Sequence, residues 1–120
     1  MPQDHAPLAN DMVIHTKARD LLAWLLPHVA QWPKEHRFGV GQHVGAVAMR
    51  VQDALVAARH LRAALKAEAL LEADIALDQL RQYLHLAWQC RWMSEGQYLH
   101  ACGLTDEIGR LLGGWRQRSA

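Results

Sequence analysis

The sequence predicts an all-α fold, an antiparallel up-and-down four-helix bundle, from three observations. Apolar residues recur at gaps of three and four along four segments, which is the period of an amphipathic helix. The 8 glycines and 4 prolines fall mostly at the ends of these segments, and strand-like alternation extends over no useful length. Short joins between such helices favour an antiparallel bundle. We expect residues 13–116 to form it and residues 1–12 to be a flexible N-terminal segment.

The first helix is expected over about residues 13–32, with Asn10 or Asp11 as its N-cap. Pro27 lies inside it and removes one backbone hydrogen bond, which predicts a kink or a break there. Trp32-Pro33 should end it, because the residue before a proline disfavours helical angles. The inward face carries Leu22, Leu25, Val29 and Trp32.

Pro33 suits the opening of the second helix, where its missing N–H costs nothing. Gly41 and Gly45 should let a neighbouring helix approach closely; a phosphate-binding loop is disfavoured because no strand precedes them. We expect a turn near residues 63–69 to join the second helix to the third, because one unbroken helix over residues 34–92 would be extremely long for a small domain. The expected inward stripe is Phe38, Gly41, Val44, Ala48, Val51, Leu55, Ala58 and Leu65.

The third helix shows the clearest pattern, a heptad seam with alternating gaps of three and four. Its members are Leu70, Ala73, Leu77, Leu80, Leu84 and Ala87. Ser94 should cap the fourth helix, and Gly113-Gly114 should end it, with Trp115 folded back onto the last turn. The inward stripe of the fourth helix is Tyr98, Ala101, Thr105, Ile108 and Leu112.

Charge is unevenly distributed along the chain, although the net charge is only +1. Residues 34–66 are basic and residues 67–78 are acidic. Arg59, Arg62 and Lys66 follow each other at gaps of three and four, so on one helix they would share a face that could follow phosphates. The alternative is a solvated face that pairs with acidic residues. The candidate nucleic-acid contacts are Arg37, Arg50, Arg59, Arg62, Lys66 and Arg81.

Patterns for catalysis, metal binding or membrane insertion are not found in the sequence. Neither Glu-x-x-His nor His-Glu-x-x-His occurs, the two cysteines form no Cys-x-x-Cys pair, and the two serines stand at helix ends. The strongly apolar stretch over about residues 21–32 is too short to cross a bilayer. We therefore expect a cytoplasmic non-enzyme without a cofactor or metal. The five tryptophans could pack between helices or form a subunit interface; Trp88 and Trp92 would form one ridge.

Two stretches carry a family resemblance. The first joins the first two helices and reads Trp-Pro-Lys-Glu-His-Arg-Phe-Gly-Val-Gly-Gln over residues 32–42. The second combines Gln-Tyr-Leu-His-Ala at 97–101 with Asp-Glu-Ile-Gly-Arg-Leu-Leu-Gly-Gly-Trp at 106–115. Together they resemble the accessory variability determinant (Avd) proteins of diversity-generating retroelements. These belong to a wider four-helix-bundle group that includes proteins encoded by intervening sequences in ribosomal RNA genes.

The resemblance implies a homopentameric barrel of four-helix bundles without catalytic residues. It also implies that the protein binds the element's reverse transcriptase and template RNA or cDNA, and so supports mutagenic retrohoming. The alternative is a structural protein–protein module of the ribosomal intervening-sequence type. Members tend to be clearly basic, whereas this chain is nearly neutral. The motif positions to which the resemblance assigns a structural role are Pro33, Lys34, Phe38, Gly41, Gly109, Arg110, Gly113, Gly114 and Trp115.

Overall fold

The computed structural model describes residues 9–119, and side chains from residue 13 onward. Within this range the chain forms only helices and turns, which confirms the predicted all-α class. The long helices are α1 (Ala9–Val29), α3 (Gln42–His60), α4 (Ala63–Gln89) and α5 (Glu95–Arg118). Two short elements, α2 (Lys34–His36) and the π-helical turn η2 (Arg37–Gly41), join α1 to α3. Residues 1–8 of the predicted flexible segment lie outside the described residues.

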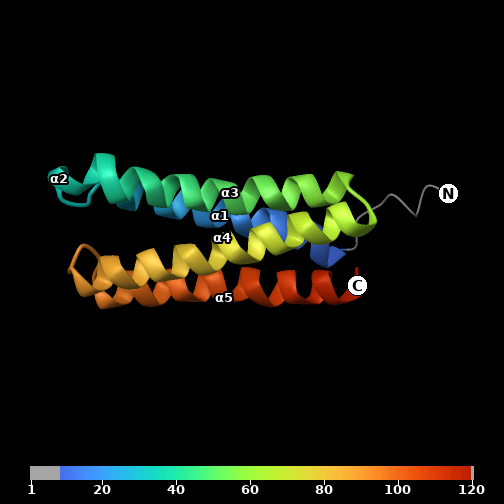
Figure 1. Cartoon of the computed structure of the whole chain (residues 1–120). Coiled ribbons are helices and arrows are strands. Elements are labelled where there is room, and N and C mark those ends of the chain that lie inside the picture. The colour runs from blue at the N-terminus through green and yellow to red at the C-terminus, as the bar shows by residue number, and fades with distance from the viewer. Residues whose placement is uncertain (1–8, 120) are drawn as a thin grey trace.

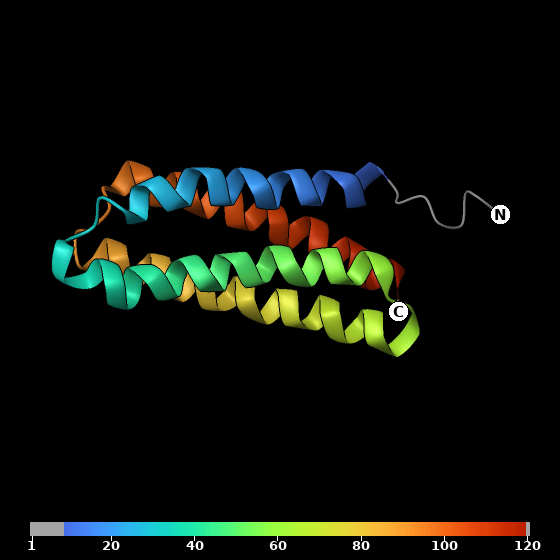
Figure 2. The same cartoon turned by 90° about the horizontal axis from the view of Figure 1, so that it is seen from above.

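The long helices lie side by side along one common direction (Figure 1). α1 packs against α3 and α5, and α4 packs against the same two helices, so the four surround one core. The turn between α3 and α4 lies at the same end of the molecule as the end of α5 (Figure 2). α2, η2 and the turn between α4 and α5 lie at the opposite end. We call these the α3–α4 end and the α4–α5 end.

The seam predicted on α4 forms the centre of the core. All six of its residues are at most 1% exposed, so this prediction is confirmed. The predicted stripe on α5 is also largely confirmed, because Ala101, Thr105, Ile108 and Leu112 are at most 1% exposed, while Tyr98 is half-buried. Burying each leucine or isoleucine of these stripes contributes about 1.5–3 kcal/mol. α1 and α3 complete the core with Ile14, Leu21, Leu25, Val44, Val51 and Leu55.

α1 differs from its predicted bounds at both ends. It starts at Ala9, so Asn10 and Asp11 lie inside the helix and neither is the N-cap. It continues past Pro27 to Val29, so the chain does not break at the proline, which lies in the last turn. Trp32 follows in the turn, where its N–H donates to Val29 O at 3.1 Å, and its side chain is fully buried.

Gly41 and Gly45 allow η2 and α3 to approach α1, as predicted. A Cβ at Gly41 would lie 3.0 Å from Cγ1 of Val29 and 3.3 Å from the carbonyl oxygen of His36. A Cβ at Gly45 would lie 3.4 Å from Cδ2 of Leu26. The contacts at Gly41 are tighter than an added Cβ normally makes, so a larger residue would push Val29 or the backbone away, and this favours glycine there.

Two residues of the stripe predicted for the second helix are exposed instead. Phe38 is 84% exposed and Leu65 is 59% exposed, so neither belongs to the core. Phe38 lies in η2, where a π-helical turn holds more residues than an α-helical turn and shifts the stripe out of register. Leu65 lies on another helix, because the chain turns at residues 61–62, slightly before the predicted join, and α4 begins at Ala63.

The start of α5 is confirmed and its predicted end is wrong. Ser94 accepts the Gln97 N–H at 3.1 Å, and the Gln97 side chain accepts the Ser94 N–H at 2.9 Å, which makes a capping box. α5 then continues through Gly113 and Gly114 to Arg118. Neither glycine adopts the positive φ of a helix C-cap. Trp115 is therefore helical and only 4% exposed, with its ring edge-on to His15 at 5.9 Å.

Candidate nucleic-acid interface

The structure separates the six predicted nucleic-acid contacts into four places. Arg59, Arg62 and Lys66 lie at the α3–α4 end, whereas Arg37 lies near the opposite end of the bundle. Arg50 lies on α3 and Arg81 on α4, each bonded to a neighbouring helix. The six residues therefore do not form one continuous face.

Arg59, Arg62 and Lys66, which we call the basic cluster, come from three different local structures. Arg59 belongs to the last turn of α3, Arg62 is the residue before α4, and Lys66 lies in the first turn of α4. The prediction that they share one helix face is wrong, because the chain reverses between Arg59 and Lys66. The reversal nevertheless keeps all three within or next to the turn between α3 and α4, which lies at one end of the bundle (Figure 1).

The electrostatics of the basic cluster favour an anion. Arg59 and Arg62 are exposed, Lys66 is half-buried, and neither Arg59 nor Lys66 forms an ion pair with a described residue. The N-terminus of α4 carries a partial positive charge that adds to the potential of Arg62 and Lys66. Glu68 and Glu72 follow on α4 and limit the positive region to this end of the molecule.

Two further arginines at this end were missed by the sequence reasoning. Arg116 and Arg118 lie in the last turn of α5, which reaches the α3–α4 end. The guanidinium of Arg116 pairs with Asp74 of α4, Nη1 to Oδ2 at 3.0 Å. The Arg-x-Arg pattern near the C-terminus was a signal for them, but the predicted helix end at Gly113-Gly114 placed both arginines beyond the last helix.

Arg37 supports the corner between α1 and α3. Its Nε donates to the carbonyl oxygen of Trp32 at 2.8 Å, across the turn that contains Pro33. This bond satisfies a carbonyl that follows the end of α1, so it supports the direction of the chain into η2. In the same segment, Lys34 is exposed and begins α2, with Pro33 as the residue before it.

Arg50 and Arg81 each join two helices. Arg50 of α3 donates from Nη2 to Oε1 of Gln79 on α4. Arg81 of α4 donates from Nη2 to the carbonyl oxygen of Thr105 on α5 at 3.2 Å. Asp106 lies 3.9 Å from the same nitrogen. Both guanidinium groups are thus engaged within the bundle.

Gly109 explains how Arg81 reaches α5. A Cβ at Gly109 would lie 2.5 Å from Nη2 of Arg81, so the missing side chain makes the space for the guanidinium. Arg110, the next residue of the family motif, is exposed on α5. Gly113 has open space around its Cα, so packing alone does not require glycine there.

Other kinds of site find little support in residues 9–119. No group of three or more His, Cys, Asp or Glu side chains in this range could hold a metal ion. Cys90 is exposed, Cys102 is half-buried, and both are free thiols. None of the helices described is long and apolar enough to span a bilayer.

The comparisons with known proteins point to one family. No curated protein and no solved structure matches the chain. A family model described as bAvd-like matches residues 12–119, which include both motif stretches and all four long helices except the start of α1. The chain therefore belongs to the bAvd-like family.

Proposed function

We propose that this chain is the non-catalytic accessory protein of a diversity-generating retroelement. In this proposal it is an antiparallel four-helix bundle that assembles into a homopentamer in the cytoplasm. The assembly binds the element's reverse transcriptase and the template RNA or cDNA during mutagenic retrohoming. Membership of the bAvd-like family supports the accessory role.

The single observation that carries nucleic-acid binding is the basic cluster. Three cations meet at the α3–α4 end, and two of them form no ion pair with a described residue. A phosphate that binds there releases counterions and gains charge-assisted hydrogen bonds. Lys66 and Arg62 also stand beside the positive end of the α4 dipole. The chain can thus bind a polyanion although its net charge is only +1.

Charge reversal in the basic cluster tests this proposal. We expect Arg59→Glu/Lys66→Glu to weaken binding to single-stranded RNA about tenfold or more at moderate salt, because two phosphate contacts become repulsive. The slope of log affinity against log salt should fall by about 1.4, which is about 0.7 for each lost contact. Fluorescence anisotropy of a labelled oligonucleotide at several salt concentrations measures both quantities.

Arg19→Glu/Arg110→Glu is the matched control for this reversal. It makes the same change in net charge at two exposed positions outside the basic cluster, one on α1 and one on α5. Its salt slope should stay close to that of the unmodified chain. Equal losses in both double variants would mean that overall charge acts and that the basic cluster does not bind RNA. Affinity independent of salt would reject phosphate contacts altogether.

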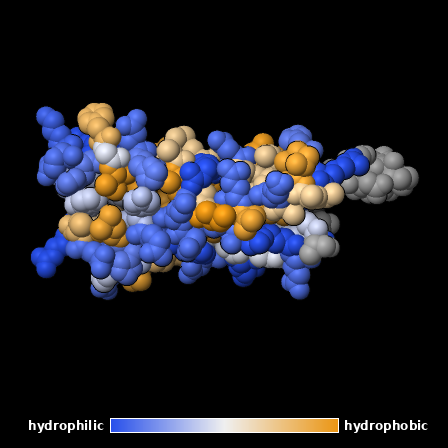
Figure 3. All heavy atoms as spheres, in the orientation of Figure 1, coloured by the Kyte–Doolittle hydropathy of each residue, from blue (hydrophilic) through white to orange (hydrophobic). Residues whose placement is uncertain are grey.

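Exposed apolar side chains on α3 and α4 support self-assembly. On α4, Leu71 is 45% exposed and Ile75 is 49% exposed, and both line a groove of about 490 Å³ whose other lining residues are Arg50, Glu68, Glu72 and Gln79. On α3, Met49 and Val56 are 47% and 39% exposed. Figure 3 shows apolar patches among polar side chains on the face where α4 lies in front. Apolar surface of this kind is typical of protein interfaces.

The pentamer is expected to have a mass of about 68 kDa, five times the 13.6 kDa of one chain. Leu71→Glu/Ile75→Glu should reduce the mass to that of one chain without loss of helicity, because an interface does not tolerate buried, unpaired carboxylates. Gln82→Glu/Gln117→Glu adds two carboxylates at other exposed positions and should leave the mass unchanged. Light scattering with circular dichroism separates these outcomes. An unchanged mass in both variants would exclude the groove as the subunit interface.

The alternative function is a structural module that binds only proteins, of the ribosomal intervening-sequence type. The same exposed apolar residues on α3 and α4 favour it, since they fit a protein partner as well as a second copy. The RNA titration separates the two functions. A purely structural module would bind no RNA at any salt concentration, while the accessory protein binds it through the basic cluster.

A further inference from the structure

A second place in the molecule combines an aromatic surface with opposite charges, outside the basic cluster. It is a pocket of about 760 Å³ at the turn between α4 and α5. This volume is within the range of pockets that bind small molecules. The lining residues are Trp88, Gln89, Arg91, Trp92, Met93, Ser94 and Glu95.

Trp88 is held in a fixed orientation by its neighbours. Its indole stacks on Tyr98 of α5 at 5.2 Å with an angle of 12°, and His85 contacts it edge-on at 5.8 Å. The Tyr98 hydroxyl also lies 3.2 Å from Nδ1 of His85. Burial and then the hydrogen bond to Cys102 raise the pKa of Tyr98, so its phenol stays neutral at physiological pH. Trp88 is 36% exposed and presents part of its ring system to the pocket.

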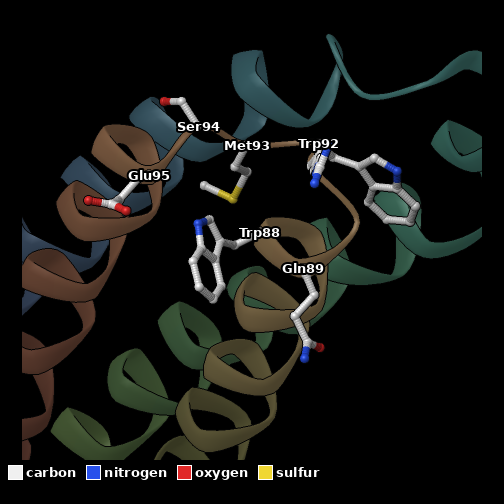
Figure 4. A pocket seen from close by; sticks show the side chains of 7 residues that line it. Trp88, Gln89, Trp92, Met93, Ser94 and Glu95 are labelled. Carbon is white, nitrogen blue, oxygen red and sulfur yellow. The ribbon is translucent and has the colours of Figure 1, made fainter.

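The turn that places the charges is also rigid. The Trp92 N–H donates to Ala87 O at 2.8 Å and the Arg91 N–H donates to Trp88 O at 2.9 Å, which is the Schellman pattern of a helix end. The Trp92 ring points away from the pocket (Figure 4) and stacks on His36 at 4.7 Å. The predicted ridge of Trp88 and Trp92 is therefore wrong, because α4 ends at Gln89, between them.

Arg91 stands where this helix end normally has glycine. Its φ is 63°, in the left-handed region, which is unfavourable for a residue with a side chain. Strained conformations of this kind are enriched at functional sites, and Ala63 at the start of α4 is the other described non-glycine residue with a positive φ. Arg91 is exposed, and its side chain forms no ion pair or hydrogen bond with a described residue. Its guanidinium is therefore available to an anionic group in the pocket.

Glu95 adds a carboxylate on the other side of the pocket, in the first turn of α5 (Figure 4). A carboxylate only accepts hydrogen bonds, and its two oxygens can accept from two adjacent donors. Among the four RNA bases, guanine alone offers two adjacent donors, N1–H and the N2 amino group, on its Watson–Crick edge. An unpaired base can present this edge while one of its faces stacks on an aromatic ring.

From these contacts we propose that the α4–α5 pocket binds an unpaired guanine nucleotide of single-stranded RNA or DNA. The base stacks on Trp88, Glu95 accepts from N1–H and the N2 amino group, and Arg91 binds a phosphate. This inference rests on the proposed nucleic-acid function. It adds base preference, which the basic cluster cannot supply because phosphate contacts carry no sequence information.

The test compares RNA oligonucleotides of seven uridines in which the central nucleoside is replaced by guanosine, inosine or adenosine. The corresponding DNA oligonucleotides are measured beside them. We expect the guanine oligonucleotide to bind about tenfold tighter than the adenine one, with inosine in between because it lacks the N2 amino group. Trp88→Ala should weaken guanine binding about tenfold, and Glu95→Gln should remove the preference for guanine. Glu35→Gln makes the same change at an exposed residue of α2 and should keep the preference.

Arg91→Gly separates binding from folding. Glycine suits the left-handed position, so this variant should melt no lower than the unmodified chain, yet bind every oligonucleotide more weakly and with a salt slope smaller by about 0.7. Equal affinity for guanine and adenine, or undiminished binding by Trp88→Ala, would overturn the inference. If salt-sensitive binding through the basic cluster persists in that case, the proposed function stands. If the unmodified chain binds no oligonucleotide, both fail.

Discussion

Leu77→Ala is expected to lower the free energy of unfolding by about 2–5 kcal/mol. Leu77 is fully buried at the centre of the α4 seam, and its Cδ2 lies 3.6 Å from the position that a Cβ would take at Gly109 of α5. The substitution removes buried methyl groups and leaves a cavity that tightly packed neighbours fill only in part. For a domain of this size the melting temperature should fall by about 4 °C for each kcal/mol.

Leu99→Ala is the matched control, because the same atoms are removed from a side chain that is 59% exposed on α5. It should change the free energy of unfolding by less than about 0.5 kcal/mol. Urea denaturation followed by circular dichroism, at one protein concentration for all variants, measures both effects. Similar losses in the two variants would mean that the α4 seam does not face the core of the bundle.

Gly41→Leu is expected to destabilise the corner between α1 and α3 by about 1–3 kcal/mol. Its Cβ would lie 3.0 Å from Cγ1 of Val29 and 3.3 Å from a backbone oxygen, so α1 and η2 must move apart. That movement separates Val29, Trp32 and Gly41, which now pack together at the α4–α5 end. The effect should appear as a lower urea midpoint with an unchanged slope, because the surface exposed on unfolding stays similar.

Gly39→Leu provides the comparison within the same π-helical turn. Gly39 is exposed, has no atom within 4 Å of an added Cβ, and does not adopt a positive φ. The substitution should therefore leave stability unchanged or raise it slightly, since glycine is a poor helix former. A loss equal to that of Gly41→Leu would show that chain flexibility in η2, and not the approach of α1, requires the glycines.

Much of the fold could be predicted because each helix carries its own local signal. The gaps of three and four on α4 identified its buried face residue by residue, and Ser94 identified the start of α5 through its capping chemistry. These signals fail where the local pattern fits two structures. Gly113-Gly114 is compatible with a helix end and with a helix interior, and the neighbouring burial of Trp115 decides for the interior.

The candidate sites depended more strongly on contacts between distant residues. Arg81 was also a candidate phosphate contact in the sequence, but Gly109 and Thr105 of α5 provide a place for its guanidinium against α5. Arg37 likewise donates to Trp32 O, which no spacing rule predicts. The α4–α5 pocket was not predicted, because it depends on where the stacking of Trp88 on Tyr98 and the positive φ of Arg91 place their side chains.

The sequence by itself determined the helical class, the buried seam and the family, because periodicity, capping residues and motif letters are properties of neighbouring residues. Only the tertiary structure decided which arginines remain available to a partner, where the helices turn, and that Trp88, Arg91 and Glu95 share one pocket. The physical reason is that a hydrogen bond or a stacked ring between two helices depends on their relative position. That position follows from the packing of the whole core and not from any single segment.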